Sequence, residues 1–198
     1  MRCLCILFRS SLLFTSFLFS GLLVLAQKPF PDSAQKCFEE GELRFDKEDY
    51  DESILYFNEC LRLQAYFAEA YYWRGQAYEQ VNRLAFALND YTSYLQLVPQ
   101  NPEALFNRGR VHYRLEQFQQ AKEDFTWLLA QPTHETNTVY FRRDVYTGGV
   151  DQLMTTHQSS RGQIFQLLGL AETKLNNYAG AVQAFDSALH YMPNDADL

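Results

Sequence analysis

The chain has 198 residues, 47% of them hydrophobic and 21% charged, which supplies enough apolar side chains for one domain with its own core. Its formal net charge is −7; without residues 1–26 it is 15 bases against 24 acids, or −9. This composition excludes wholesale disorder, and the acidic surface argues against binding to nucleic acid, which depends on neutralising phosphates.

Residues 1–26 are predicted to be a signal peptide. Two arginines precede the uncharged apolar run 11–26, which ends in Val24-Leu25-Ala26, with small residues at the positions that a signal peptidase requires. The alternative is an uncleaved membrane anchor, although the run is shorter than the roughly 20 apolar residues that span a bilayer. We expect an exported protein, periplasmic or secreted, in which residues 27–33 form a linker.

A 34-residue repeat follows the linker. Its windows are residues 34–67, 68–101, 102–135 and, after an interruption, 162–195. Position 8 is always glycine, as Gly41, Gly75, Gly109 and Gly169. Position 20 is always small, as Ser53, Ala87, Ala121 and Ala181. Position 24 is always aromatic, as Phe57, Tyr91, Phe125 and Phe185. Position 28 is always leucine, as Leu61, Leu95, Leu129 and Leu189.

The repeat predicts stacked pairs of helices. Small residues at positions 8 and 20 let two antiparallel helices approach closely, while bulky residues fill the space around them. A single pair cannot bury its apolar face, so neighbouring pairs share a core. The pattern strongly resembles the tetratricopeptide repeat family over residues 34–135 and 162–195. The resemblance implies an all-α, right-handed α-solenoid of four helix pairs. Position 7 departs from the family's apolar residue, being Glu40, Arg74 and Arg108.

The segment 136–161 interrupts the repeats and changes in composition to residues that favour strands. Two such runs, 138–146 and 150–157, flank Gly148-Gly149, a pair suited to a tight hairpin turn. We predict a β-hairpin inserted between the third and fourth repeats; the alternative is a loop without a partner.

Arg142 and Arg143 are the candidate contact residues of this insertion. They form the only adjacent basic pair in an acidic chain once residues 1–26 are removed. Two interpretations stay open, because the pair could hold an acidic partner or the solenoid's own carboxylates, and we favour packing onto the solenoid.

The sequence offers no catalytic chemistry. A nucleophile motif, a P-loop, a dinucleotide fingerprint and an HExxH motif are all missing. The chain also has no CxxC motif and no cluster of cysteine and histidine. His112 stands at repeat position 11, where an aromatic residue normally packs, so we interpret it as a residue at the edge of the core. We therefore predict no catalytic residue, no cofactor and no metal site.

The resemblance implies a binding groove lined by the first helix of each pair. Carried over by position, the groove residues are Phe38, Glu42, Tyr72, Gln76, Phe106, Arg110, Arg114 and Lys174. The row is acidic in the first repeat and basic in the third and fourth, which predicts an extended partner segment with its acidic end near Arg110 and Arg114. Basic residues at position 13 could instead complement a helix C-terminus, which explains Arg114 and Lys174 but not Arg110.

The family's clamp for chaperone carboxylates has lysine and asparagine where this chain has Phe38 and Glu42, so a co-chaperone of that type is disfavoured.

Two cysteines, Cys37 and Cys60, remain after residues 1–26 are removed, on opposing predicted helices. Export would allow a disulfide between them, and buried thiols are the alternative.

The favoured function is a non-catalytic scaffold that binds a protein or peptide, with contact to a membrane only through an uncleaved signal segment. The first alternative is a self-assembling structural protein. The sequence stops at Leu198, soon after the last repeat and without a polar capping helix, so that repeat could form a homodimer. The second alternative is an enzyme with an unrecognised composite site.

Overall fold

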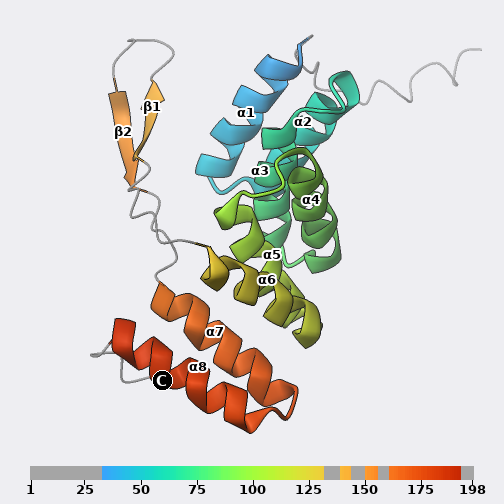
Figure 1. Cartoon of the computed structure of the whole chain (residues 1–198). Helices are drawn as coiled ribbons and strands as arrows, with labels where there is room; N and C mark the ends of the chain where they lie inside the picture. The colour runs from blue at the N-terminus through green and yellow to red at the C-terminus, as the bar shows by residue number, and fades with distance from the viewer. Residues whose placement is uncertain (1–32, 132–138, 144–149, 156–160, 193–198) are drawn as a thin grey trace, which may run out of the picture. The chain divides into compact units, whose positions relative to one another are not determined.

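The computed structural model describes residues 33–131, 139–143, 150–155 and 161–192 (Figure 1). Residues 31–198 form one compact unit, which contains every helix described here. The predicted signal peptide lies outside the described residues, and its cleavage stays a prediction.

The described helices form an α-solenoid of four pairs (Figure 1). The helices are α1 (Ala34–Asp46), α2 (Tyr50–Leu63), α3 (Ala68–Gln80), α4 (Leu84–Leu97), α5 (Pro102–Arg114), α6 (Phe118–Ala130), α7 (Arg161–Lys174) and α8 (Tyr178–Tyr191). Helices α1, α3 and α5 begin at the first position of their windows, and α7 begins one residue before its window.

Each pair turns through a left-handed residue at repeat position 15. These residues are Glu48, Asn82, Glu116 and Asn176, with φ of 62°, 57°, 60° and 60°. In each turn the amide of position 16 donates to the carbonyl of position 11, as between Gln117 and His112 at 2.9 Å. This bond satisfies a carbonyl that the helix end would leave unpaired, so the same turn ends the first helix in all four pairs.

Within each pair, the glycine of position 8 faces the aromatic ring of position 24. A Cβ added at Gly109 would lie 2.7 Å from Cε1 of Phe125, and the corresponding distances at Gly41, Gly75 and Gly169 are 2.6, 3.1 and 2.7 Å. Phe57, Tyr91 and Phe125 are fully buried. The glycine column therefore exists because the ring occupies the space that a larger side chain would need.

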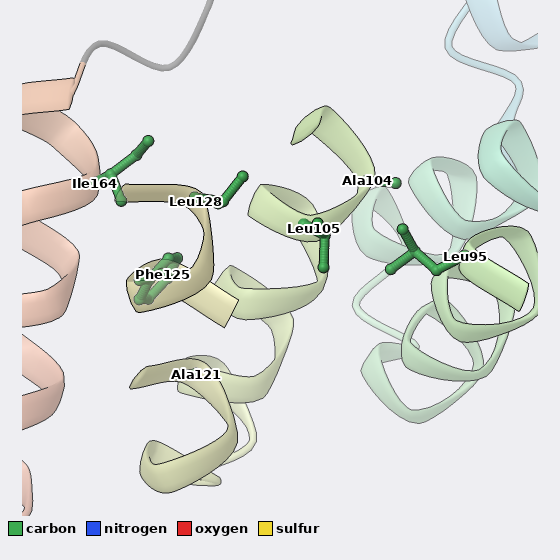
Figure 2. Close-up of a cluster of buried hydrophobic side chains, with 7 residues drawn as sticks. All are labelled: Leu95, Ala104, Leu105, Ala121, Phe125, Leu128 and Ile164. Atoms are coloured by element: carbon green, nitrogen blue, oxygen red, sulfur yellow. The ribbon is translucent and has the colours of Figure 1, made fainter. Parts of the chain in front are cut away.

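Neighbouring pairs share their core. Figure 2 shows one cluster of buried apolar side chains drawn from α4, α5, α6 and α7. Its members are Leu95, Ala104, Leu105, Ala121, Phe125, Leu128 and Ile164. Ile164 of α7 joins this cluster, and Lys122 Nζ of α6 lies 2.9 Å from Glu172 Oε1 of α7. The fourth pair thus packs on the third despite the 26 residues inserted between their windows.

The charged residues at position 7 have partners that the sequence analysis missed. Arg74 donates to both carboxylate oxygens of Asp90, at 2.7 and 2.6 Å. Arg108 makes the same two-pronged contact with Asp124, which stands at position 23 like Asp90. Both carboxylates are buried. In the second and third repeats an internal ion pair therefore replaces the apolar contact that the family has at position 7.

Two short strands, β1 (Val139–Arg143) and β2 (Val150–Thr155), pair antiparallel, with Val139 opposite Thr155. Residues 144–149, including the predicted Gly148-Gly149 turn, lie outside the described residues. The side chains of the strands lie outside them as well, so the hairpin turn and the contacts of Arg142 and Arg143 stay predictions.

Candidate functional site

The second and third helix pairs form a polar pocket on the first-helix side of the solenoid. Its lining residues come from α3, α4 and α5 and are Gln76, Glu79, Gln80, Tyr91, Asn107 and Arg110. Two of the predicted groove residues, Gln76 and Arg110, meet in this pocket, although they lie in different repeats. Gln80 stands at repeat position 13, which the resemblance also assigns to the groove, whereas Glu79, Tyr91 and Asn107 were not predicted from the sequence.

Glu79 is the centre of the pocket. Its side chain is only 8% exposed. The hydroxyl of Tyr91 donates to Oε2 of Glu79 at 2.8 Å. On the opposite side, Oε1 accepts from Nη2 of Arg110 and from Nη1 of Arg114, both at 3.3 Å. One carboxylate thus gathers donors from its own pair and from the next one.

The structure adds an acidic side chain to the basic end that the sequence predicts for the groove. Arg110 and Arg114 both share the carboxylate of Glu79. The three side chains together carry one positive charge instead of two. The arginine side chains are still 42% and 39% exposed, so the remaining positive charge faces solvent.

Further contacts hold both arginines in place. Arg114 Nη2 donates to Asn82 Oδ1 at 2.8 Å. The guanidinium of Arg110 lies 5.9 Å from the ring centroid of Phe106, within the range of a cation–π contact. Phe106, another predicted groove residue, is half-buried and acts as a support for Arg110.

Tyr72 borders the site from α3. Its hydroxyl accepts from Asn107 Nδ2 at 3.2 Å, and its ring packs against Tyr94 at 5.2 Å. Burial is the main cause that raises the pKa of both Tyr72 and Tyr91 above the ordinary value of 10.0. Both phenols therefore stay protonated at neutral pH, and Tyr91 acts as a donor to Glu79.

Three predicted groove residues lie away from this pocket. Phe38 is 8% exposed and stacks on Phe67 with ring centroids 4.9 Å apart, so it belongs to the core and offers no accessible aromatic surface. Glu42 is half-buried on α1, and Lys174 is exposed in the last turn of α7. The predicted row of groove residues is therefore not continuous: its centre is the pocket.

Cys37 and Cys60 are fully buried thiols in the cluster between the first and second helix pairs. Burial is the largest cause that raises the pKa of Cys60 to about 12, and the neighbouring Cys37 adds to it. The Cys37–Cys60 disulfide stays a prediction.

No three side chains of His, Cys, Asp or Glu come together as a metal site within the described ranges. His112 is 13% exposed on its side chain and its Nδ1 lies 2.6 Å from Gln117 Oε1, which places it at the edge of the helix pair. Among the helices that the structure describes, none has both the length and the apolar composition needed to cross a membrane.

Comparison with known proteins gives one consistent result. Two models of the tetratricopeptide repeat match residues 38–102 and 102–126. No curated protein sequence matches the chain significantly. Of the solved structures, a MamA crystal structure is 17% identical, with a TM-score of 0.64 over 85% of this chain and 83% of that one.

Two further structures agree. MamA 41-end from Desulfovibrio magneticus RS-1 is 14% identical, with a TM-score of 0.62 over 83% of this chain and 78% of that one. A tetratricopeptide repeat protein from Parabacteroides merdae ATCC 43184 is 19% identical, with a TM-score of 0.60 over 82% of this chain and 53% of that one. At these identities the likeness concerns the fold. Together with the matching repeat models and the four repeated helix pairs, it identifies the chain as a member of the tetratricopeptide repeat family.

Proposed function

We propose that this protein is a non-catalytic scaffold that binds a protein or an extended peptide outside the cytoplasm. The binding surface is the first-helix side of the solenoid, centred on the pocket around Glu79. The observation that supports the proposal most is the sharing of this one carboxylate by Arg110 and Arg114 across two helix pairs.

The shared carboxylate favours an acidic group on the partner. Each arginine contacts Oε1 at 3.3 Å, which is longer than a strong charge-assisted hydrogen bond of about 2.8 Å. Each guanidinium group therefore has N–H donors left for a second acceptor. A carboxylate on the partner would accept hydrogen bonds from them. Its negative charge would also balance the net positive charge of the site.

The amide side chains suit an extended backbone. Gln76, Gln80 and Asn107 line the same pocket, and each amide carries both a donor and an acceptor. An extended peptide presents unpaired N–H and C=O groups along its backbone. The amide side chains can form hydrogen bonds with these groups whatever the sequence of the peptide. The arginines would then select for the acidic residue.

A random peptide library displayed on phage tests this function. We expect selected peptides to be enriched in aspartate or glutamate, and the double variant Arg110→Gln/Arg114→Gln to bind the best synthetic peptide about tenfold or more weakly. The matched control is Arg62→Gln, which removes a 67% exposed arginine of α2 that pairs with Glu59. Absence of enrichment over an empty display would refute the proposed function. Equal binding by both variants would refute the role of the pocket.

The proposed location rests on residues 1–26. Expression of the full chain with its own N-terminus, followed by mass spectrometry of the protein outside the cytoplasm, should give a mature chain that begins at Gln27. A protein that keeps Met1 and stays in the cytoplasmic fraction would refute export, without bearing on peptide binding.

A further inference from the structure

Helix α8 carries an exposed apolar face. Tyr178, Val182, Phe185 and Leu189 follow the spacing i, i+4, i+7 and i+11, which places them along one side of α8. Tyr178, Val182 and Leu189 are 63%, 59% and 43% exposed, and Phe185 is half-buried. We call these four residues the α8 stripe.

The same repeat positions are less exposed in the earlier pairs than in the fourth. At position 21, Ile54 of the first pair is 4% exposed, whereas Val182 of the last pair is 59% exposed. At position 28, Leu61 and Leu95 are 9% and 7% exposed, against 43% for Leu189. In those pairs the following pair covers this side, so the α8 stripe has the composition of an interface between pairs.

We propose that the α8 stripe binds the α8 stripe of a second copy of this chain, across a two-fold axis. The exposed parts of these side chains amount to roughly 300 Å² of apolar surface per copy. A standard interface buries about 800 Å² per partner, a little over half of it apolar, so the stripe supplies about two-thirds of the apolar part.

The electrostatics favour pairing of like with like at this surface. The chain is acidic, with a net charge of −7, so most of its surfaces repel a second copy. The α8 stripe has no charged member, and Asp186 is the only acid in α8. Two α8 helices can therefore approach without burying charges of the same sign.

Head-to-tail stacking of copies is a poorer fit. The opposite end of the solenoid is α1, whose position 3 is the exposed Lys36. In the following pairs this position is Ala70, Ala104 and Ile164, all buried against the preceding pair. Stacking α1 on the α8 stripe would bury the ammonium of Lys36 against apolar side chains, and removing this charge from water costs free energy.

Sedimentation velocity of residues 27–198, which include all of the compact unit from 31 onward, tests the proposal. We expect a monomer–dimer equilibrium with a dissociation constant on the order of 1–100 µM, given the modest apolar area. The double variant Val182→Glu/Leu189→Glu should be monomeric over this range. The control Leu55→Glu places the same charge on α2 at a side chain that is 53% exposed, and it should dimerise like the wild type.

A cysteine variant separates the two geometries. In a two-fold dimer only residues near the axis meet their own copies, and Val182 lies towards the middle of the stripe. Val182→Cys should therefore form an oxidised dimer through residue 182, whereas Leu55→Cys should not. A monomeric wild-type chain at the highest concentration, a dimer that survives the double glutamate variant, or failure of Val182→Cys to crosslink would each overturn the proposal. Circular dichroism spectra that match the wild type establish that each variant is folded.

Discussion

Replacement of Gly109 by alanine tests whether the glycine column sets the distance between the helices of a pair. The new Cβ would lie 2.7 Å from Cε1 of Phe125 and 3.1 Å from its Cζ. Normal carbon contacts begin at about 3.5 Å, so the ring or the helix must shift by roughly 1 Å. Phe125 is fully buried in the cluster of Figure 2, so a shift of its ring would disturb the apolar side chains packed around it.

Two effects of opposite sign decide the stability of this variant. Alanine is favoured over glycine inside a helix by about 1 kcal/mol. Overpacking of a dense core costs about 1–3 kcal/mol, and a fully buried ring puts Gly109→Ala at the upper end of that range. We therefore expect a net loss of about 2 kcal/mol, which corresponds to a fall in Tm of roughly 4–8 °C for a domain of this size.

The other repeats provide matched controls. At Gly75 the nearest ring atom, Cε1 of Tyr91, lies 3.1 Å from the added Cβ, so Gly75→Ala should be close to neutral. At Gly169 the distance to Phe185 is again 2.7 Å, but this ring is half-buried and can move outward. Gly169→Ala should therefore cost less than Gly109→Ala despite the equal distance.

Urea unfolding followed by circular dichroism at 222 nm measures this order. The comparison uses transition midpoints, because repeat arrays can unfold in more than one step. The double variant Gly109→Ala/Phe125→Leu removes the overlapping ring atoms and should cost less than the sum of the two single variants. If Gly109→Ala were as stable as the wild type, the ring would not limit the approach of the helices and our reasoning would be wrong.

Three further predictions concern individual contacts. Asp90→Asn should lower the free energy of unfolding in urea by about 3 kcal/mol, because it leaves Arg74 with an uncompensated buried charge. The double variant Arg74→Met/Asp90→Leu should recover most of this loss, because it removes both charges. Glu116→Gly should raise stability by up to about 1 kcal/mol in the same assay, because glycine adopts its left-handed φ of 60° without strain; an unchanged midpoint would contradict this. Burial raises the pKa of Cys60 from 9.0 to about 12, so a maleimide should not label this thiol in the folded protein at about pH 8. The free energy of unfolding should fall as the pH rises above 9, because only the thiol of the unfolded chain then ionises. After denaturation of residues 27–198 without reductant, reaction of both Cys37 and Cys60 would exclude a disulfide between them, and reaction of neither would confirm it.

The sequence predicted the repeat because each of its signals is local or recurs at a fixed spacing. Glycine at position 8 and an aromatic residue at position 24 fall on opposing helices in every window, so their contact follows from the register alone. The ion pair of Arg74 with Asp90 has the same fixed spacing, 16 residues, and recurs in the next window. It was missed because position 7 was compared with the family's apolar residue and position 23 was not considered.

The pocket could be predicted only in part. Gln76 and Arg110 were placed in a groove by their repeat positions, but Glu79 was not linked to Arg110 and Arg114, from which it is separated by 31 and 35 residues. The contact joins position 12 of one repeat to positions 9 and 13 of the next. An acidic residue at position 12 followed by basic residues at positions 9 and 13 is the sequence pattern that would have predicted it. Phe38 was placed in the same row, and only the packing of Phe67 against it shows that it belongs to the core.

The sequence by itself determined the four helix pairs and their turns, because hydrophobic spacing and small residues act between neighbours in the chain and repeat with a period of 34 residues. The tertiary structure decided which polar side chains share a partner and which apolar side chains stay uncovered. Both depend on how one pair lies against the next: Glu79 acquires two arginines because another pair follows it, and the α8 stripe is exposed where no described pair covers it.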